Sequence, residues 1–377
     1  MTFSKGYRDI ADKIQWREKV ARIVDLRSDT VTQPTEEMRE AMRNAVVGDD
    51  YYREDPTVAE LEELAAAKLG KEAGLFVASG TMGNLVSILT HTQRGDAVIL
   101  EAEAHVYRCE TAHLAAVAGV MPKRVKGNRG VLDPADVEEA VFAGGVLYPT
   151  TRLLCVENTH NAAGGTCVTP AQMSALKEVA DRYGLGIHVD GARIFSAAVA
   201  LDVDPQELVE QADSATFCLS KNLVCPFGSL IVADREFIER ARRNRQMVGG
   251  GMRQAGIMAA AGIVALQTMI DRLSEDHANA RVLAEGLFEL GLEIDMEAVQ
   301  TNMVFLEVSS EMMDVNDFVR DLGDLGVRVN PPAGRRVRMV THYGITREDV
   351  EYTIQAVRNV IRRAGGGVGS HRQGSSG

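Results

Sequence analysis

The sequence predicts an α/β protein with a mostly parallel sheet, followed by a smaller α+β unit. From about residue 57 onward, short apolar runs alternate with helical stretches, and Thr57 and Gly70 are expected to cap and end the first helix. The runs predicted as strands cover 75–79, 97–101, 152–158, 186–190, 215–220 and 228–234. This alternation is typical of parallel sheets covered on both faces, which bind ligands at the carboxyl ends of their strands.

The pattern changes after the glycine-rich stretch at 249–256. A long Ala- and Ile-rich helix is expected over about 255–290, and a strand–helix–strand pattern follows over 303–343. The sequence therefore predicts four regions. They are an N-terminal arm with an amphipathic helix (1–24), a large domain (25–255), a linking helix with a small domain (256–364) and a disordered Gly/Ser-rich tail (365–377).

Charge and composition exclude several classes of partner. The net charge of −12 argues against nucleic acid and anionic membranes, which are bound mainly through Lys and Arg. One basic stretch is the exception, and we interpret it as a solvated or subunit-facing side of a helix, with a phosphate contact as the alternative. It contains Arg240, Arg242, Arg243 and Arg245.

Composition also predicts the cellular compartment. No secretory signal and no membrane-spanning run are recognisable, since uncharged apolar runs of about 18 residues are absent. The five scattered cysteines show neither CxxC pairs nor the spacing of metal ligands. We therefore expect no bound metal, and a reduced, cytoplasmic location rather than a disulfide framework.

Two residues at strand ends suggest a cofactor. Asp190 ends the strand at 186–190, and Lys221 lies just past the strand at 215–220, with a helical stretch between them. Parallel neighbouring strands would bring both side chains to one crevice. Pyridoxal phosphate needs such a pair, because the lysine amine condenses with its aldehyde and the carboxylate pairs with its ring nitrogen. The alternative is an ordinary surface salt bridge.

A candidate phosphate site precedes this pair in the chain. In LFVASGTMGN a strand leads through Ser79, Gly80 and Thr81 into a helix, with Asn84 as a further donor. Backbone N–H groups at a helix N-terminus bind phosphate, and glycine permits close approach. A plain helix cap is the alternative.

Other polar residues follow strand ends. His105 could stack on a cofactor ring or be an exposed loop histidine, while Asn158, Thr159 and His160 could reach the ring oxygen or the substrate. For His160 a purely structural role is an alternative. Two arginines, each also compatible with an ordinary surface position, could hold a substrate carboxylate in a bidentate pair. They are Arg193 and Arg338.

Together these motifs resemble the low-specificity threonine aldolases of the β-eliminating-lyase superfamily. The similarity runs from about residue 24 to 360 and is carried by long, specific stretches. They are DLRSDTVTQPT (25–35), GDDYYREDPT (48–57), SGTMGN (79–84), ENTHN (157–161), HVDGARIFSA (188–197), LSK (219–221) and GGGMRQAG (249–256).

The resemblance implies a fold, a cofactor and a set of roles. The fold would be that of fold-type I pyridoxal-phosphate enzymes, like aspartate aminotransferase, with a mostly parallel seven-stranded sheet. Lys221 would form the internal aldimine, Asp190 would meet the ring nitrogen and His105 would stack on the ring. The other implied roles are phosphate binding by Gly80 and Thr81, binding of the substrate carboxylate by Ser28, Arg193 and Arg338, and a position of Tyr52 near the cofactor across a subunit interface. The family is typically a tetramer built from dimers.

The chain also departs from the family pattern. Leu147 stands where the family has a histidine near the substrate hydroxyl, and Arg53 replaces a glycine after the site tyrosine. The glycine-rich stretch after the lysine reads Asn-Leu-Val-Cys at 222–225. These changes surround the expected site with bulkier residues.

The expected reaction is cleavage of a threonine-like 3-hydroxy-L-amino acid to glycine and an aldehyde. Without the family histidine, His105 or an ordered water would take the hydroxyl proton. The alternative is racemisation or β-elimination on another amino acid, with Lys221 as the base and an anionic substrate paired with Arg53. A non-catalytic, pyridoxal-binding or assembly protein on the same fold is an alternative from a different class, and the missing GxGxxG argues against a nicotinamide oxidoreductase.

Overall fold

The computed structural model describes residues 22–142 and 144–367, and these form two compact units. Of the described residues, the larger unit holds those from Thr32 to His277, and the smaller unit joins residues 22–31 to residues 278–367. The predicted arm helix and most of the predicted tail lie outside the described residues. The tail prediction was wrong at its start, because the last helix continues to Gly367.

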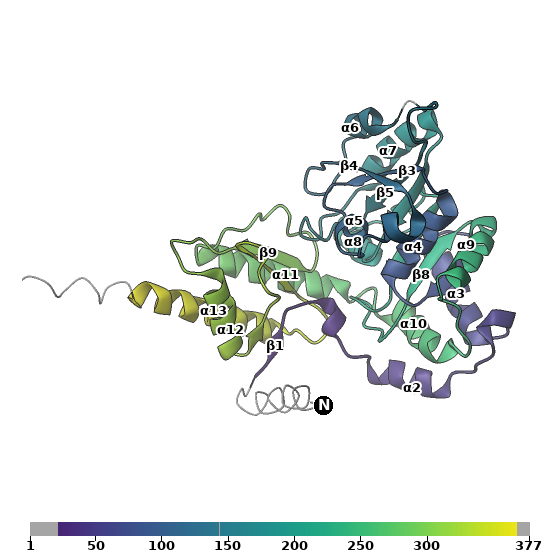
Figure 1. The fold of residues 1–377 in the computed structure, drawn as a ribbon. Coiled ribbons are helices and arrows are strands. Elements are labelled where there is room, and N and C mark those ends of the chain that lie inside the picture. The colour runs from purple at the N-terminus through teal and green to yellow at the C-terminus, as the bar shows by residue number, and fades with distance from the viewer. Residues whose placement is uncertain (1–21, 143, 368–377) are drawn as a thin grey trace, which may run out of the picture. The chain divides into compact units, whose positions relative to one another are not determined.

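The central sheet of the larger unit matches the predicted α/β class. It has seven strands in the order β2-β8-β7-β6-β5-β3-β4, and only β8 is antiparallel to its neighbours. Strands β3, β4, β5 and β8 of this sheet are labelled in Figure 1. The strands are β2 (Ala73–Val77), β3 (Ala97–Glu101), β4 (Met121–Val125), β5 (Thr151–Glu157), β6 (Gly186–Asp190), β7 (Ser214–Cys218) and β8 (Ser229–Ala233). The sequence pattern missed β4 because this edge strand is half-exposed and contains Lys123 and Arg124.

Helices cover both faces of this sheet, as the alternation of side chains along each strand requires. On β2, Leu75 and Val77 face a core shared with α4 and α9, whereas Phe76 faces the core shared with α3, α7, α8 and α10. The helices of the larger unit are α2 (Glu36–Asn44), η2 (Asp50–Tyr52), α3 (Pro56–Lys68), α4 (Gly80–His91), α5 (His105–Arg108), η3 (Leu114–Ala118), α6 (Pro134–Ala140), α7 (Pro170–Tyr183), α8 (Ile194–Leu201), α9 (Arg235–Met247) and α10 (Gly256–Thr268).

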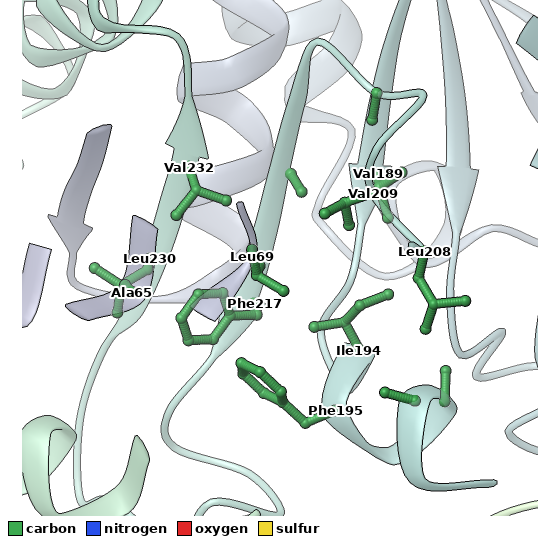
Figure 2. Close-up of a cluster of buried hydrophobic side chains, with 14 of the residues drawn as sticks. Ala65, Leu69, Val189, Ile194, Phe195, Leu208, Val209, Phe217, Leu230 and Val232 are labelled. Carbon is green, nitrogen blue, oxygen red and sulfur yellow. The ribbon is translucent and has the colours of Figure 1, made fainter. Parts of the chain in front are cut away.

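The core beneath β6 and β7 fixes the strands that carry the predicted site. Phe195 of α8 and Phe217 of β7 meet edge to face with ring centroids 5.2 Å apart (Figure 2). Val189, Leu230 and Val232 are buried in the same cluster. The strand ends beyond this cluster are therefore held on a rigid support.

Two helix predictions were wrong in detail. Helix α3 begins earlier than expected, because Asp55 caps it by accepting from Val58 N at 3.0 Å and Pro56 occupies the first turn. The hydroxyl of Thr57 instead donates to the carbonyl of Val46. The long helix expected over 255–290 is two helices, α10 and α11 (Leu273–Glu289), bent by 73°.

Periodicity could not reveal that bend, because buried apolar residues continue through the break, with Met269 before it and Leu273 after it. In the described part of the chain no single helix is long and apolar enough to cross a membrane. Helices α10 and α11 are long and apolar enough for a membrane span only when the two are counted together.

The smaller unit has two short sheets and its own core. Strands β9 (Met303–Glu307) and β11 (Arg336–Val340) pair antiparallel, and β1 (Val24–Asp25) pairs in parallel with β10 (Val327–Arg328). Its helices are η1 (Asp29–Val31), most of α11, α12 (Val315–Asp324) and α13 (Arg347–Gly367). Residues 25–31 belong here rather than to the larger unit because β1 pairs with β10.

The interpretation of the basic stretch as a solvated helix side was wrong for Arg245. This side chain of α9 is buried, donates to Asp50 Oδ2 at 2.6 Å and to the carbonyl of Phe76 at 2.7 Å, and so ties η2 to the sheet. Arg242 pairs with Glu62 at 2.8 Å. Arg240 and Arg243 are exposed, as that interpretation expects.

We expect Arg245→Ala to lower the free energy of unfolding by about 3–5 kcal/mol, because it leaves the carboxylate of Asp50 buried with less compensation. Urea denaturation followed by circular dichroism would measure this loss. The exposed neighbour provides the control, and Arg243→Ala should change stability by less than about 0.5 kcal/mol. Equal denaturation midpoints for the two variants would contradict the role of this ion pair.

Candidate active site

Asp190 and Lys221 lie at the same edge of the sheet. Strands β6 and β7 are adjacent and parallel, with Asp190 opposite Thr216, and Lys221 follows the end of β7 by three residues. The positive charge of Lys221 partly opposes the net rise in the pKa of Asp190, which burial causes, and in that of His105, which Glu110 causes, so the amine lies near both groups. The predicted convergence of amine, acid and imidazole therefore agrees with the topology.

Asp190 is a buried carboxylate that lacks a strong cationic partner among the described side chains. Its Oδ2 accepts from Asn84 Nδ2 at 2.8 Å, and its Oδ1 accepts from the backbone N–H of Ala192 at 3.2 Å. Burial, and then the charges of Glu157 and Glu110, raise its pKa to about 6. Such a group favours a cation beside it, and a protonated ring nitrogen is one.

Glu110 is a site residue that the sequence analysis missed. Its Oε1 lies 2.7 Å from His105 Nδ1, and its Oε2 lies 2.6 Å from His113 Nε2. Burial alone would raise its pKa, but the hydrogen bonds from His105, His113 and Asn84 outweigh burial and lower the pKa to about 2. One ligand atom each from His105, Glu110 and Asp190 lie within 4.8 Å of one another, so the ionised Glu110 belongs to the site.

The predicted phosphate site is the first turn of α4. Ser79 caps this helix by accepting from Met82 N at 3.2 Å, and the first backbone bond into the helix is Gly83 N to Ser79 O. The N–H groups of Gly80 and Thr81 come before that bond and are the ones a helix N-terminus presents to an anion. A Cβ at residue 80 would lie 2.7 Å from Cys218 Sγ, so the close approach requires glycine.

Asn84 was wrongly assigned to this phosphate site. Its side chain points into the core, where Nδ2 donates to Glu110 and Asp190 and Oδ1 accepts from Thr216 Oγ1 at 2.9 Å. The sequence contains this residue but does not give the direction of its side chain, because the fifth residue of a helix can face either the ligand or the sheet.

The polar side chains of Asn158 and His160, which follow β5, make hydrogen bonds within the protein. The amide of Asn158 exchanges hydrogen bonds with the backbone of Val168, at 2.9 and 3.1 Å, so a contact with the cofactor stays a prediction. His160 is buried and bonded to Glu101 at 3.0 Å, which agrees with the structural alternative. The hydroxyl of Thr159 is buried without a protein partner. Glu157, also missed, accepts from the backbone N–H of His105 at 2.6 Å and positions that histidine.

The predicted carboxylate-binding residues fall in both units. Arg193 is buried at the start of α8 in the larger unit. Ser28 and Arg338 belong to the smaller unit, where Arg338 donates to the carbonyl of Arg27 at 3.2 Å. Tyr52 is 68% exposed in η2. The substrate-binding roles of all four stay predictions.

The structure also places the residues that depart from the family pattern, which are Arg53, Leu147 and the stretch after Lys221. Arg53 has a left-handed backbone (φ 61°), which explains a glycine there in relatives, and its side chain pairs with Glu239 of α9. Leu147 is 86% exposed in the loop before β5. Asn222 donates to Ser196 Oγ at 2.6 Å and is buried, so the stretch after Lys221 packs against α8.

The donor set fits pyridoxal phosphate. A glycine-lined helix N-terminus suits the phosphate, the buried carboxylate of Asp190 suits a protonated ring nitrogen, and Lys221 supplies an amine at the strand end between them. His105 is half-buried beside Asp190, a position from which an imidazole can lie against the ring.

Comparisons with known proteins agree with this assignment. The family model described as beta-eliminating lyase matches residues 25–310. The chain is 44% identical to low-specificity L-threonine aldolase 1 of Arabidopsis thaliana over 91% of this chain and 97% of the relative. It is 41% identical to the low-specificity L-threonine aldolase of Escherichia coli K12, over 87% of this chain and 96% of the relative.

A solved structure of the Leishmania major threonine aldolase superposes with a TM-score of 0.78 at 18% identity, covering 89% of this chain and 99% of that one, which confirms the fold. The match to the family model and the two sequence relatives cover most of the chain. The chain therefore belongs to the beta-eliminating lyase family and is a pyridoxal-phosphate-dependent lyase of fold type I.

Proposed function

We propose that this enzyme cleaves a threonine-like 3-hydroxy-L-amino acid to glycine and an aldehyde. The observation that carries the proposal is the convergence of Lys221, Asp190 and the His105–Glu110 pair at one edge of the sheet. It occurs in a chain whose relatives over almost its full length are named threonine aldolases.

Each residue has a chemical task in this reaction. When bound, the cofactor supplies an electron sink for the pair released as the Cα–Cβ bond breaks. The amine of Lys221 would hold the cofactor, and the carboxylate of Asp190 would keep positive charge at its ring nitrogen. Ser28, Arg193 and Arg338 are proposed to bind the substrate carboxylate, which orients the Cα–Cβ bond.

The proposal is tested by the products. Purified protein loaded with pyridoxal phosphate should release glycine and acetaldehyde from threonine in equal amounts. Pyruvate or ammonia release, or loss of chirality alone, would instead identify the β-eliminating lyase or racemase alternative. A panel of 3-hydroxy amino acids assayed for glycine then defines the preferred side chain.

The structure offers no support for an anionic substrate held by Arg53, since its guanidinium is paired with Glu239. We expect Arg53→Gly to leave the preference between threonine and an acidic 3-hydroxy amino acid within about threefold of wild type, a difference below about 1 kcal/mol. The ratio of the two kcat/KM values measures this preference. A selective loss of the acidic substrate would show that Arg53 leaves Glu239 to bind it.

We also propose a homotetramer, a dimer of dimers, in the cytoplasm. Val46, Tyr52 and Met247 are apolar or aromatic side chains between 65% and 68% exposed in the larger unit, as expected where subunits meet. The five cysteines are all free, and four are buried, which suits a reducing compartment. Light scattering on purified protein would test the tetramer, and fractionation of source cells would test the location.

A further inference from the structure

Glu110 is the buried carboxylate on which the polar groups of this site converge. It binds His105 with one oxygen, His113 with the other, and shares the amide nitrogen of Asn84 with Asp190. We propose that Glu110 is a positioning residue that makes Nε2 of His105 the base for the substrate hydroxyl. This inference rests on the proposed aldol cleavage and names the residue that carries its proton transfer.

The direction of the His105 ring follows from the first contact. Nδ1 lies 2.7 Å from Glu110 Oε1, and an ionised carboxylate only accepts hydrogen bonds, so Nδ1 carries a proton. Nε2 is then the ring nitrogen that can take up a further proton. A carboxylate that fixes the tautomer and orientation of a histidine in this way is the arrangement used by general bases in hydrolases.

Glu110 cannot turn away from His105, because its other oxygen is also held. His113 Nε2 lies 2.6 Å from Oε2, and Nδ1 of His113 is buried without a partner. A proton on Nε2 therefore satisfies the only hydrogen bond that the His113 ring makes within the described residues. The third donor, Asn84 Nδ2, lies 2.9 Å from Oε1.

A buried chain of hydrogen bonds fixes Asn84 in turn. His91 Nε2 lies 2.8 Å from Ser214 Oγ, Ser214 Oγ lies 2.9 Å from His188 Nδ1, and His188 Nε2 lies 3.2 Å from Asn84 Oδ1. Burial lowers the pKa of His91 to about 4 and that of His188 to about 3, so both rings are neutral. Each group can then donate to the next, which turns the amide nitrogen of Asn84 toward the two carboxylates.

The charges around His105 favour its basicity. Glu110 is the main cause of its raised pKa, burial opposes this, Asp190 adds to it and Lys221 lowers it. Glu157 accepts from its backbone N–H. In the proposed step the hydroxyl proton moves to Nε2, the O–H electron pair becomes the C=O bond of the aldehyde, and the Cα–Cβ pair stays on Cα. Leu147, which replaces the family histidine, has no group that could accept this proton.

The test compares Glu110→Gln with a matched variant in the loaded enzyme. Glutamine keeps the size of the side chain and removes its charge. Glu103→Gln makes the same change two residues before His105, at a half-exposed carboxylate that pairs with Arg108. The readouts are the pH profile of kcat/KM for threonine and the titration of His105 by NMR of histidine-labelled enzyme, with the signal assigned by its loss in His105→Asn.

The expected result is specific in sign. The base must be neutral, so activity falls on the acidic side of its pKa, and removing Glu110 lowers that pKa. In Glu110→Gln the acidic limb and the NMR midpoint should both move down by about one pH unit, while the plateau falls about 10- to 100-fold. Glu103→Gln should change neither. A loss of rate with both midpoints unmoved would overturn the proposal, because a merely structural role predicts that outcome.

The two proposals fail separately. If wild-type enzyme releases no glycine from threonine, the proposed function is wrong, and the role of Glu110 as the base-positioning residue for that step is wrong with it. If glycine is released but the His105 midpoint is the same in wild type and Glu110→Gln, only the inference about Glu110 is overturned.

Discussion

Replacing Lys221 with alanine is expected to reduce cleavage of threonine by on the order of 10⁴-fold or more, the scale seen when a covalent catalytic group is removed. The side chain lies at the carboxyl end of β7, next to the strand that carries Asp190. Alanine removes the amine that would anchor the cofactor. Neither the phosphate site nor the core beneath the strands should change.

Borohydride reduction provides an independent measurement of the same residue. In wild type it should fix the cofactor covalently to the peptide that contains residue 221, and in Lys221→Ala that label should disappear. Lys177→Ala, a half-exposed lysine of α7 paired with Asp181, is the control and should keep both activity and label. Retention of more than about 1% of the activity in Lys221→Ala would show that another amine performs the reaction.

The strand ends of this site could be predicted because they depend on periodicity alone. The apolar runs before Asp190 and Lys221 identify two buried strands, and parallel neighbours place their carboxyl ends together. The glycine that begins α4 could be predicted for the same reason, since a strand–glycine–helix pattern has few structural solutions. The places of Asp190, Lys221 and Gly80 therefore follow from where the strands and the helix begin and end in the sequence.

Glu110, Asn84 and Glu157 were not predictable in this way, because their roles depend on side-chain direction across the sheet. Asn84 lies one helical turn beyond the phosphate site and points toward Asp190, far along the chain. Glu110 lies in an irregular segment after α5, where no period applies. The only signal was an acidic residue between two histidines in HVYRCETAH, a pattern that a solvated loop also produces.

Asp190→Asn is the second change with a large expected effect, and we expect it to lower kcat by about 10²- to 10³-fold. Asparagine keeps two polar atoms at the end of β6 but cannot hold positive charge at the ring nitrogen. Asp190→Glu, which keeps the charge on a longer side chain, is the control and should retain more activity than the amide. Cleavage within tenfold of wild type in Asp190→Asn would contradict the assigned role.

Asp190→Asn should lower activity but raise the free energy of unfolding. This contrast distinguishes the effect of the charge of Asp190 from the effect of the size of its side chain. In the ligand-free chain, burial, Glu157 and Glu110 raise its pKa from 3.8 to about 6. An acid with a raised folded-state pKa destabilises the fold where the unfolded chain ionises it, so its cost grows between pH 4 and 6 and is fully present at pH 7. Unfolding free energies of wild type and Asp190→Asn, measured at pH 4 and pH 7, should therefore diverge by on the order of 2 kcal/mol in favour of the variant at pH 7. If the difference in unfolding free energy between the two proteins is independent of pH, Asp190 is already paired with a cation without the cofactor. If that difference grows toward neutral pH, the site keeps an unfavourable charge for the cofactor to neutralise.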